Sequence, residues 1–126
     1  MTSETIGQRF LAEHRIKRGA DFQRAFKRRC VASDAVLVVY ACENGLPHAR
    51  LGLSISRKVG NAVRRNRWKR LLRESFRLER QRLPEGVDLV VIPRPEIEPD
   101  LDALRTALLG NARRAAAKLA RRGPLT

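Results

Sequence analysis

The sequence is short of cysteine and histidine, and it has no long apolar run. The spacing of its two cysteines, Cys30 and Cys42, matches no zinc-binding pattern, and we expect both to be buried, reduced thiols. The two histidines, His14 and His48, stand alone, so no Ser/His/Asp or Cys/His catalytic set can be assembled. No apolar stretch approaches the length of a membrane span, and no signal-like segment opens the chain. We therefore expect a cytoplasmic protein.

Acidic residues are also scarce, because 13 Asp and Glu stand against 27 Lys and Arg, a net charge of +14. The hydrophobic content of 43% is ordinary for a folded domain, so the charge does not mark a disordered tail. Such an imbalance indicates a polyanionic partner, most commonly nucleic acid and less commonly an anionic membrane surface. The basic residues are 22 Arg and 5 Lys. This bias is typical of phosphate recognition, although a GC-rich genome produces the same bias.

Hydrophobic periodicity predicts a loosely ordered N-terminal segment, residues 1–18, followed by a single domain over residues 19–123. Asp21 is placed to cap the first helix of that domain. The predicted elements are helices at 19–29, 61–82 and 101–122 and strands at 35–41, 50–56 and 87–92. This order of helix, two or three strands, helix, strand and helix indicates an α+β fold with helices against one sheet.

Along the predicted strand over residues 50–56, apolar residues alternate with other residues, and the second face is unusual because it consists largely of the small residues Gly52, Ser54 and Ser56. That face leaves room for a ligand. Phe22 and Phe26 lie four residues apart on one side of the first helix, and with Tyr40 they are candidates for a platform that stacks single-stranded bases. Plain core packing explains the same spacing of the phenylalanines, and the sequence leaves both alternatives open.

The helix predicted over residues 61–82 separates into an apolar and a basic face. The apolar face gathers Trp68, Leu71, Leu72, Ser75 and Leu78, with Phe76 at its edge. The opposite face gathers Asn66, Lys69, Arg70, Arg73, Arg77 and Arg80. Between Arg57 and Arg82, eleven basic residues stand against two acids, a local charge of 11 − 2 = +9. Surface helices usually mix both signs to form ion pairs, so this one-signed face indicates a phosphate-binding helix. Flanking strands disfavour a helix-turn-helix motif.

The continuous stretch LGLSISRKVGNAVRRNRWKRLLRESF, residues 51–76, resembles the protein subunit of bacterial ribonuclease P. The motif that carries the resemblance is the triplet Arg65-Asn66-Arg67, followed by Lys69-Arg70 and Arg73. The segments HRIKRGADFQRAF and DLVVIPRP match as well, so the resemblance extends from about His14 to the last helix. Two residues depart from the family pattern, Trp68 on the apolar face and Pro93 after the last strand, and both are expected to be packing variations.

The resemblance implies a two-layer α/β sandwich, with a mixed sheet of about four strands, three helices and a left-handed βαβ crossover. It also implies a function as the protein subunit of ribonuclease P, which promotes endonucleolytic 5′-end maturation of transfer RNA. In such an enzyme the protein binds the catalytic RNA and the 5′ leader of precursor transfer RNA, and the RNA subunit performs the hydrolysis.

By position, the resemblance assigns contact with the catalytic RNA to Arg57, Lys58, Arg65, Asn66, Arg67, Lys69, Arg70 and Arg73. It assigns the cleft that holds the single-stranded leader to Phe22, Phe26, Tyr40 and Ser54. The alignment of the strand that contains Tyr40 is uncertain by one residue, so either Val39 or Tyr40 faces the cleft. The choice matters because adjacent strand residues point to opposite faces of a sheet.

The resemblance further implies Mg²⁺ as cofactor, bound mainly by the RNA subunit, with the ribonuclease P RNA and precursor transfer RNA as partners. We expect no membrane contact and no protein partner. Two other functions stay open: a ribosomal-type or general RNA-binding protein of the same fold, and an autonomous metal nuclease. The nuclease would need its carboxylates to converge in a cleft, and its candidates are Glu85, Asp88, Glu96, Glu98, Asp100 and Asp102.

Overall fold

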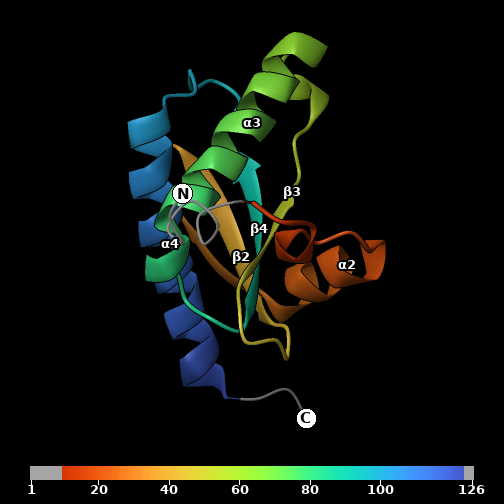
Figure 1. Cartoon of the computed structure of the whole chain (residues 1–126), viewed down its shortest axis with the longest axis vertical. Coiled ribbons are helices and arrows are strands. Elements are labelled where there is room, and N and C mark those ends of the chain that lie inside the picture. Colours follow the sequence, from red (N-terminus) through yellow and green to blue (C-terminus); the bar gives the residue numbers. More distant parts are fainter. Residues whose placement is uncertain (1–9, 124–126) are drawn as a thin grey trace, which may run out of the picture.

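A computed structural model of the chain describes residues 10–123, which form one sheet with helices on both of its faces (Figure 1). The helices are α2 (Gly19–Arg28), α3 (Ala62–Glu79) and α4 (Leu101–Arg122). The strands are β1 (Cys30–Ser33), β2 (Leu37–Glu43), β3 (Arg50–Leu53) and β4 (Val87–Pro93). Three short 3-10 helices complete the fold: η1 (Ala12–His14), η2 (Arg57–Val59) and η3 (Arg80–Arg82). Within residues 10–123, no helix is long and apolar enough to cross a membrane.

The four strands are arranged in the order β1-β2-β4-β3. β1, β2 and β4 pair in antiparallel fashion, whereas β3 pairs with β4 in parallel. The connection between these two parallel strands runs through α3, so the basic helix is the crossover of a βαβ unit, as expected. The predicted α+β fold with a mixed sheet of four strands and three helices is confirmed. The left hand of the crossover stays a prediction of the resemblance.

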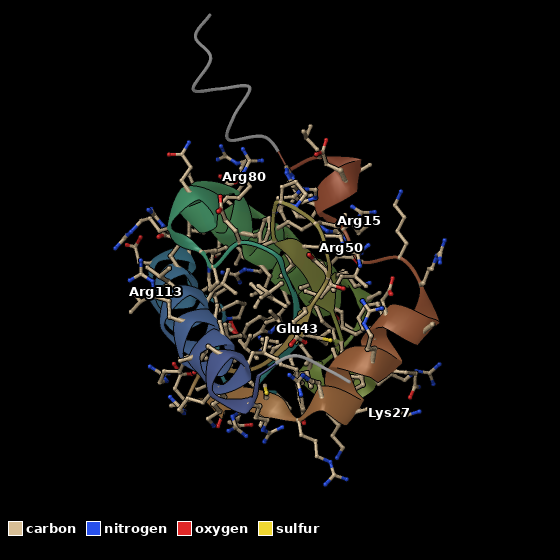
Figure 2. All side chains as sticks on the ribbon, turned by 90° about the horizontal axis from the view of Figure 1, so that it is seen from below. Arg15, Lys27, Glu43, Arg50, Arg80 and Arg113 are labelled. Carbon is tan, nitrogen blue, oxygen red and sulfur yellow. The ribbon has the colours of Figure 1, made fainter. Side chains whose placement is uncertain are left out.

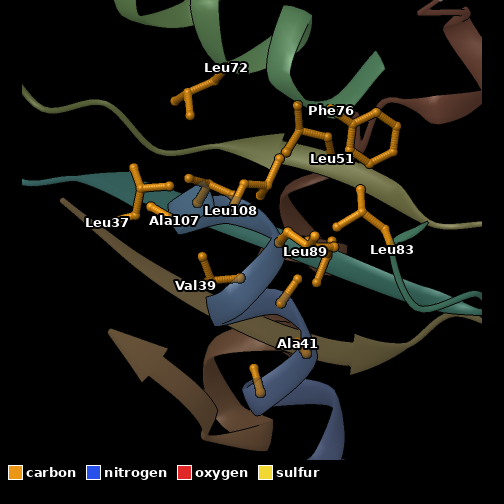
Figure 3. Close-up of a cluster of buried hydrophobic side chains, with 14 of the residues drawn as sticks. Leu37, Val39, Ala41, Leu51, Leu72, Phe76, Leu83, Leu89, Ala107 and Leu108 are labelled. Atoms are coloured by element: carbon orange, nitrogen blue, oxygen red, sulfur yellow. The ribbon is translucent and has the colours of Figure 1, made fainter. Parts of the chain in front are cut away.

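The main core lies between the sheet and the helices α3 and α4 (Figure 3). Trp68, Leu72 and Phe76 of α3 are fully buried, and Leu104 and Leu108 of α4 meet them over the sheet. Phe76, which the helical projection puts at the edge of the apolar face, is therefore a central core residue. Because this face of α3 is committed to the core, the side chains of the basic face are held on the outside.

A second, smaller core lies between α2 and the other face of the sheet. Ile16, Ala25, Cys42 and Val90 are its buried members. The two cysteines are both buried, as predicted, but they belong to different cores: Cys30 lies in the main core and Cys42 in the small one. Burial raises the pKa of the Cys42 thiol, which keeps it protonated.

Three local predictions need correction. Asp21 does not cap α2, because the N-cap position is Arg18 and Asp21 lies in the first helical turn. The predicted strand at 35–41 is shifted by two residues, since the Asp34 carboxylate accepts the backbone N–H groups of Val36 and Leu37 in a turn. Strand β1 had no residues assigned to it.

The described part of the N-terminal segment packs against the domain. His14 and Ile16 are buried, Arg15 bridges to Leu51 of β3, and Phe10 packs edge-on against Phe76 with ring centroids 5.6 Å apart. The predicted loose segment over residues 1–18 is therefore wrong for residues 10–18, and residues 1–9 lie outside the described residues. The reason is long-range packing, which local periodicity does not show.

Candidate nucleic-acid interface

The basic face of α3 begins at a well-formed helix start. The Asn61 side chain accepts the N–H of Arg64 at 3.0 Å and caps the helix, which is the role that asparagine commonly plays there. From this start the predicted RNA-contacting residues follow on the outer surface of α3. Asn66, Arg67 and Arg70 are exposed, Arg65, Lys69 and Arg73 are half-buried, and Arg57 and Lys58 are exposed on the preceding η2. We call Asn66, Lys69, Arg70 and Arg73 the α3 ridge.

The α3 ridge carries positive charge that the protein does not neutralise. Within residues 10–123, no carboxylate pairs with Lys69, Arg70 or Arg73. Its neighbours differ, because Arg77 pairs with Glu74 and Arg64 with Glu98. The middle of the helix therefore carries unpaired positive charge, which an external anion can reach.

Arg65 and Arg67 of the triplet are oriented by backbone oxygens. The Arg65 guanidinium donates to the carbonyl of Gly60 at 2.8 Å. Arg67 lies 3.5 Å from the carbonyl oxygen of Pro99 and 3.9 Å from the Glu98 carboxylate. A carbonyl fixes a guanidinium without removing its charge, so both residues retain donors for phosphate.

A small pocket of about 190 Å³ lies between the α3 ridge and α2. Its floor is apolar, with Phe10, Phe22 and Leu51, and its basic lining residues are Arg15, Lys69 and Arg73. Burial, and to a lesser extent the nearby charge of Arg15, lower the pKa of Arg73, and no carboxylate of the described residues lines the pocket to oppose this effect. Sequence reasoning missed both Phe10 and Arg15. Phe10 lies in the segment expected to be loose, and Arg15, although it falls within the matching segment HRIKRGADFQRAF, was assigned no role.

The predicted leader-binding residues Phe22, Phe26, Tyr40 and Ser54 gather on the α2 side of the sheet. Together with Val38 and Ile92, which the structure adds, they form a surface that we call the aromatic face. Phe26 and Tyr40 meet edge to face, with ring centroids 5.0 Å apart and planes at 87°. Val39 lies fully buried in the main core on the opposite side of the sheet. Tyr40, and not Val39, therefore belongs to this face.

Gly52 brings Phe22 close to the sheet. A Cβ atom built on Gly52 would lie 2.9 Å from the Phe22 ring and from Ile16 Cδ1, so the absence of a side chain lets the ring lie on the strand. Beyond Gly52, the N–H of Ser54 continues the pairing by donating to the Val91 carbonyl at 3.0 Å. Val38 and Ile92, which pair across β2 and β4, are half-exposed on the same face. Sequence reasoning missed these two, because both lie in strands that are apolar at nearly every position and show no alternation of polar and apolar residues.

The comparisons with known proteins agree with this geometry. The family model for ribonuclease P matches residues 10–118. The ribonuclease P protein component of Brevibacillus brevis is 41% identical over 104 residues, which cover 81% of this chain and 82% of that protein. The chain belongs to the ribonuclease P protein family. The resemblance predicted from the sequence is thereby confirmed.

Solved structures of this family superpose well on the chain. The ribonuclease P protein of Thermotoga maritima has a TM-score of 0.73 and 36% identity, covering 79% of this chain and 96% of that one. A Staphylococcus aureus ribonuclease P protein, described as a mutant with defective mRNA degradation activity, has a TM-score of 0.73 and 36% identity over 82% of this chain and 89% of that one.

Three of the six acidic residues that were candidates for a metal nuclease make other contacts in this member of the family. Asp100 caps α4 by accepting the N–H of Ala103 at 3.0 Å, and Glu98 pairs with Arg64. Asp88 is fully buried and paired with Arg50. Within residues 10–123, no three His, Cys, Asp or Glu side chains are grouped closely enough to hold a metal ion. The hypothesis of converging carboxylates is therefore not supported by the described residues.

Ion pairs hold α2 over the sheet and so position the aromatic face. Arg24 of α2 lies 3.6 Å from Asp88 of β4, and Asp21 of α2 lies 3.5 Å from Arg50 of β3. At the other end of α2, Arg28 donates to Glu43 of β2 at 2.9 and 3.2 Å. Phe22 and Phe26 lie on the helix between these anchors, so their distance from the strands is fixed by charged side chains at both ends.

Proposed function

We propose that the protein is the RNA-binding component of a ribonuclease P ribonucleoprotein that removes the 5′ leader of precursor transfer RNA. The observation that carries this proposal is the adjacency of two different surfaces, since the pocket between Phe22 and Arg73 joins the aromatic face to the α3 ridge. A folded RNA on the ridge and a single strand on the aromatic face would therefore lie side by side.

The chemistry of the two surfaces supports this division. Guanidinium groups bind phosphate through paired donors, and the α3 ridge presents them without internal counter-ions. Aromatic rings stack on unpaired bases with little dependence on sequence, which suits a leader that varies between transfer RNAs. Membership in the ribonuclease P family favours ribonuclease P RNA as the partner of the ridge.

We assign the hydrolysis to the RNA subunit, with Mg²⁺ bound mainly there. The carboxylates near the two surfaces support this assignment, because they are paired with arginines of the protein: Glu98 with Arg64 and Asp88 with Arg50. The protein's own contribution is to bind the RNA, to orient the leader and to offset the electrostatic repulsion between RNA strands. This role places the protein in the cytoplasm, where precursor transfer RNA is made.

The decisive experiment is cleavage of a precursor transfer RNA by the purified protein, by its cognate ribonuclease P RNA, and by both together at low Mg²⁺. We expect the protein alone to be inactive and the mixture to cleave the 5′ leader faster than the RNA alone. Cleavage of the precursor by RNA-free protein, or the absence of any stimulation, would contradict the proposal.

A general RNA-binding protein of the same fold is the alternative function. It would bind transfer RNA equally well with and without a leader, whereas the proposed role predicts tighter binding of the precursor. The Staphylococcus aureus relative's association with mRNA degradation makes mRNA a second substrate worth testing in the same reactions. Degradation of mRNA that requires both protein and RNA would extend the proposal, and degradation by protein alone would contradict its assignment of hydrolysis.

A further inference from the structure

The last helix, α4, carries a second concentration of positive charge. Between Leu101 and Arg122 there are six basic residues and one acid, a local charge of 6 − 1 = +5. The basic residues are Arg105, Arg113, Arg114, Lys118, Arg121 and Arg122. The α3 ridge includes none of them, and the RNA-binding role argued above does not use them.

The outer side of α4 combines these arginines with very small residues. Arg113, Arg114 and Arg121 are exposed, and the exposed Ala117 lies between them on the same side of the helix as Gly110. Figure 2 shows Arg113 pointing outward from α4, on the side of the molecule away from Arg15 and Arg50. With a rise of about 1.5 Å per residue, Arg113 and Arg121 are about 12 Å apart along the helix axis. Such a surface lets a nucleic-acid backbone approach closely between the guanidinium groups. We call Gly110, Arg113, Arg114, Ala117 and Arg121 the α4 face.

The charge of the α4 face is not neutralised by the protein. In the described part of the chain, Arg105 is the one residue of α4 that forms an ion pair, and its partner is Glu79 at 2.7 Å. The other contacts are to uncharged oxygens: Arg113 donates to the carbonyl of Arg82 at 3.2 Å, and Arg114 donates to the side-chain oxygen of Asn111. These acceptors orient the arginines and leave their charge intact.

A groove of about 540 Å³ adjoins the α4 face, between the end of α3 and the first half of α4. Arg82 and Arg105 on its walls are both held by the buried carboxylate of Glu79, at 3.1 and 2.7 Å. Arg113, also on its wall, makes no such pair. The groove therefore extends the basic surface of α4 toward the end of α3. Its lining also includes Asp102, an exposed carboxylate with no ion-pair partner among the described residues, but Asp102 lies in the first turn of α4, about 16 Å along the helix axis from Arg113.

The character of the α4 face selects the partner. Protein interfaces and membrane-binding helices need large apolar or aromatic side chains. The large apolar residues exposed among residues 10–123 are Leu11, Leu46 and Val63, and none of them belongs to α4. A surface of arginine, alanine and glycine instead suits the phosphate backbone of RNA, which binds by charge and is read without side-chain insertion.

We infer that the α4 face is a second RNA-binding surface, which contacts the phosphate backbone of a helical segment of the ribonuclease P RNA different from the segment on the α3 ridge. The inference rests on the proposed function, since it takes the same RNA as the partner. Contacts on two separated helices of the protein would fix the orientation of the RNA, which a single ridge cannot do.

The test is the salt dependence of binding to the cognate ribonuclease P RNA, measured for the full chain with the double substitution Arg113→Gln and Arg121→Gln. Each lost phosphate contact reduces the slope of log K against log salt by about 0.7 to 0.9, so we expect a reduction of about 1.4 to 1.8. The matched control is Lys27→Gln with Arg29→Gln, which removes two exposed charges from the end of α2. We expect the control to keep the wild-type slope. Equal reductions of the slope in both variants would mean that the effect is general electrostatic attraction. An unreduced slope in both variants would mean that the RNA does not contact the α4 face. Either result overturns the inference.

A second measurement locates the contact. Both native thiols are fully buried, so a cysteine introduced by Ala117→Cys can carry an iron chelate that cleaves nearby RNA through hydroxyl radicals. We expect cleavage of one helical segment from position 117 and no cleavage of that segment from Lys27→Cys, an exposed position near the end of α2 on the other face of the sheet. Absence of cleavage from position 117 would overturn the inference.

Failure of the inference and failure of the proposed function are distinguishable. Wild-type protein that neither binds the RNA nor stimulates leader removal refutes the proposed function. Wild-type protein that does both, while the α4 variant matches it in slope, refutes the second surface alone. The melting temperature of each variant verifies that the substituted proteins are folded.

Discussion

Arg50 and Asp88 form a two-pronged ion pair across the parallel strands β3 and β4, with N–O distances of 2.8 and 2.7 Å. Asp88 is fully buried, and it also accepts from the side chain of Asn44 at 3.1 Å. The hydrogen bonds that Arg50 donates raise its pKa, as expected for a cation with a buried partner. Through Arg24 and Asp21 the pair reaches α2, so it joins the small core to the helix that carries the aromatic residues.

We expect Asp88→Ala to lower the free energy of unfolding by about 3 kcal/mol or more, because it leaves Arg50 without its buried partner. Urea unfolding measures the change. Asp102→Ala is the control, since Asp102 is exposed in the first turn of α4 and is expected to cost less than about 1 kcal/mol. Equal stability of the two variants would show that the ion pair does not anchor α2.

Arg70→Gln should weaken binding of the ribonuclease P RNA and reduce the slope of log K against log salt by about 0.7 to 0.9. Arg70 is exposed and has no carboxylate partner among residues 10–123, so its loss removes a phosphate contact and leaves the fold intact. Binding titrations at several salt concentrations measure the slope, and Lys27→Gln is the single-charge control. An unchanged slope for Arg70→Gln would exclude this residue from the interface.

Phe26→Ala should reduce the affinity for precursor transfer RNA by about 1–3 kcal/mol if a base stacks on this ring. The substitution also removes packing against Tyr40, so stability is expected to fall as well. The readout is therefore the difference in affinity between transfer RNA with and without a leader. Tyr40→Phe, which keeps the ring, is expected to preserve that difference. A loss of stability with an unchanged difference would mean that Phe26 is a packing residue alone.

Gly52→Ala should cost about 1–3 kcal/mol of stability, because the added Cβ would lie 2.9 Å from the Phe22 ring and must displace it. Since Phe22 belongs to the aromatic face, the affinity for the leader should fall while that for ribonuclease P RNA holds. Gly19→Ala is the matched control: nothing lies within 4 Å of its added Cβ, and the change should stay within about 1 kcal/mol. Thermal unfolding and leader binding of both variants check the prediction.

Stability should decrease as the pH falls below 6.5, because His14 resists protonation in the folded protein. Its pKa is lowered by burial first and then by the charge of Arg80, with Glu13 opposing and His48 adding to the effect. Its Nδ1 accepts the N–H of Leu11 at 3.0 Å, a bond that protonation removes. The unfolded chain takes up the proton from about pH 6.5 downward, and the folded protein does so at lower pH, so the loss develops between these two values. Unfolding curves for His14→Gln should lack this dependence, whereas His48→Gln should retain it.

The sequence predicts α3 well because its two faces differ so strongly in composition. Eighteen residues follow the helical period, Asn61 is a favourable cap, and the apolar residues fall on the side that meets the core. The residues of the α3 ridge could be predicted for the same reason, because the residues on the side opposite the apolar face must lie on the outer surface of the helix.

The parts that the sequence did not predict depend on single turns and on distant contacts. β1 was missed because the turn before it depends on Arg29, which adopts a left-handed conformation with φ 58° and leads the chain from α2 directly into a strand. Arginine seldom adopts this conformation, so the sequence gives no sign of the turn. The sequence could not decide whether Val39 or Tyr40 faces the leader-binding side, because both faces of β2 are covered and both sets of alternating residues are apolar or aromatic. Arg15 and Phe10 join the candidate site only through the pairing of their segment with β3.

That pairing has a consequence for how the protein behaves in concentrated solution. β3 ends the sheet, and an uncovered terminal strand offers its amide groups to any neighbouring molecule. Here the Ile16 N–H donates to the Leu51 carbonyl at 3.0 Å, so residues before α2 cover this edge of the sheet. Removal of the chain up to residue 17 would therefore expose a ready template for intermolecular strand addition, and the truncated protein would associate with itself despite its high net charge.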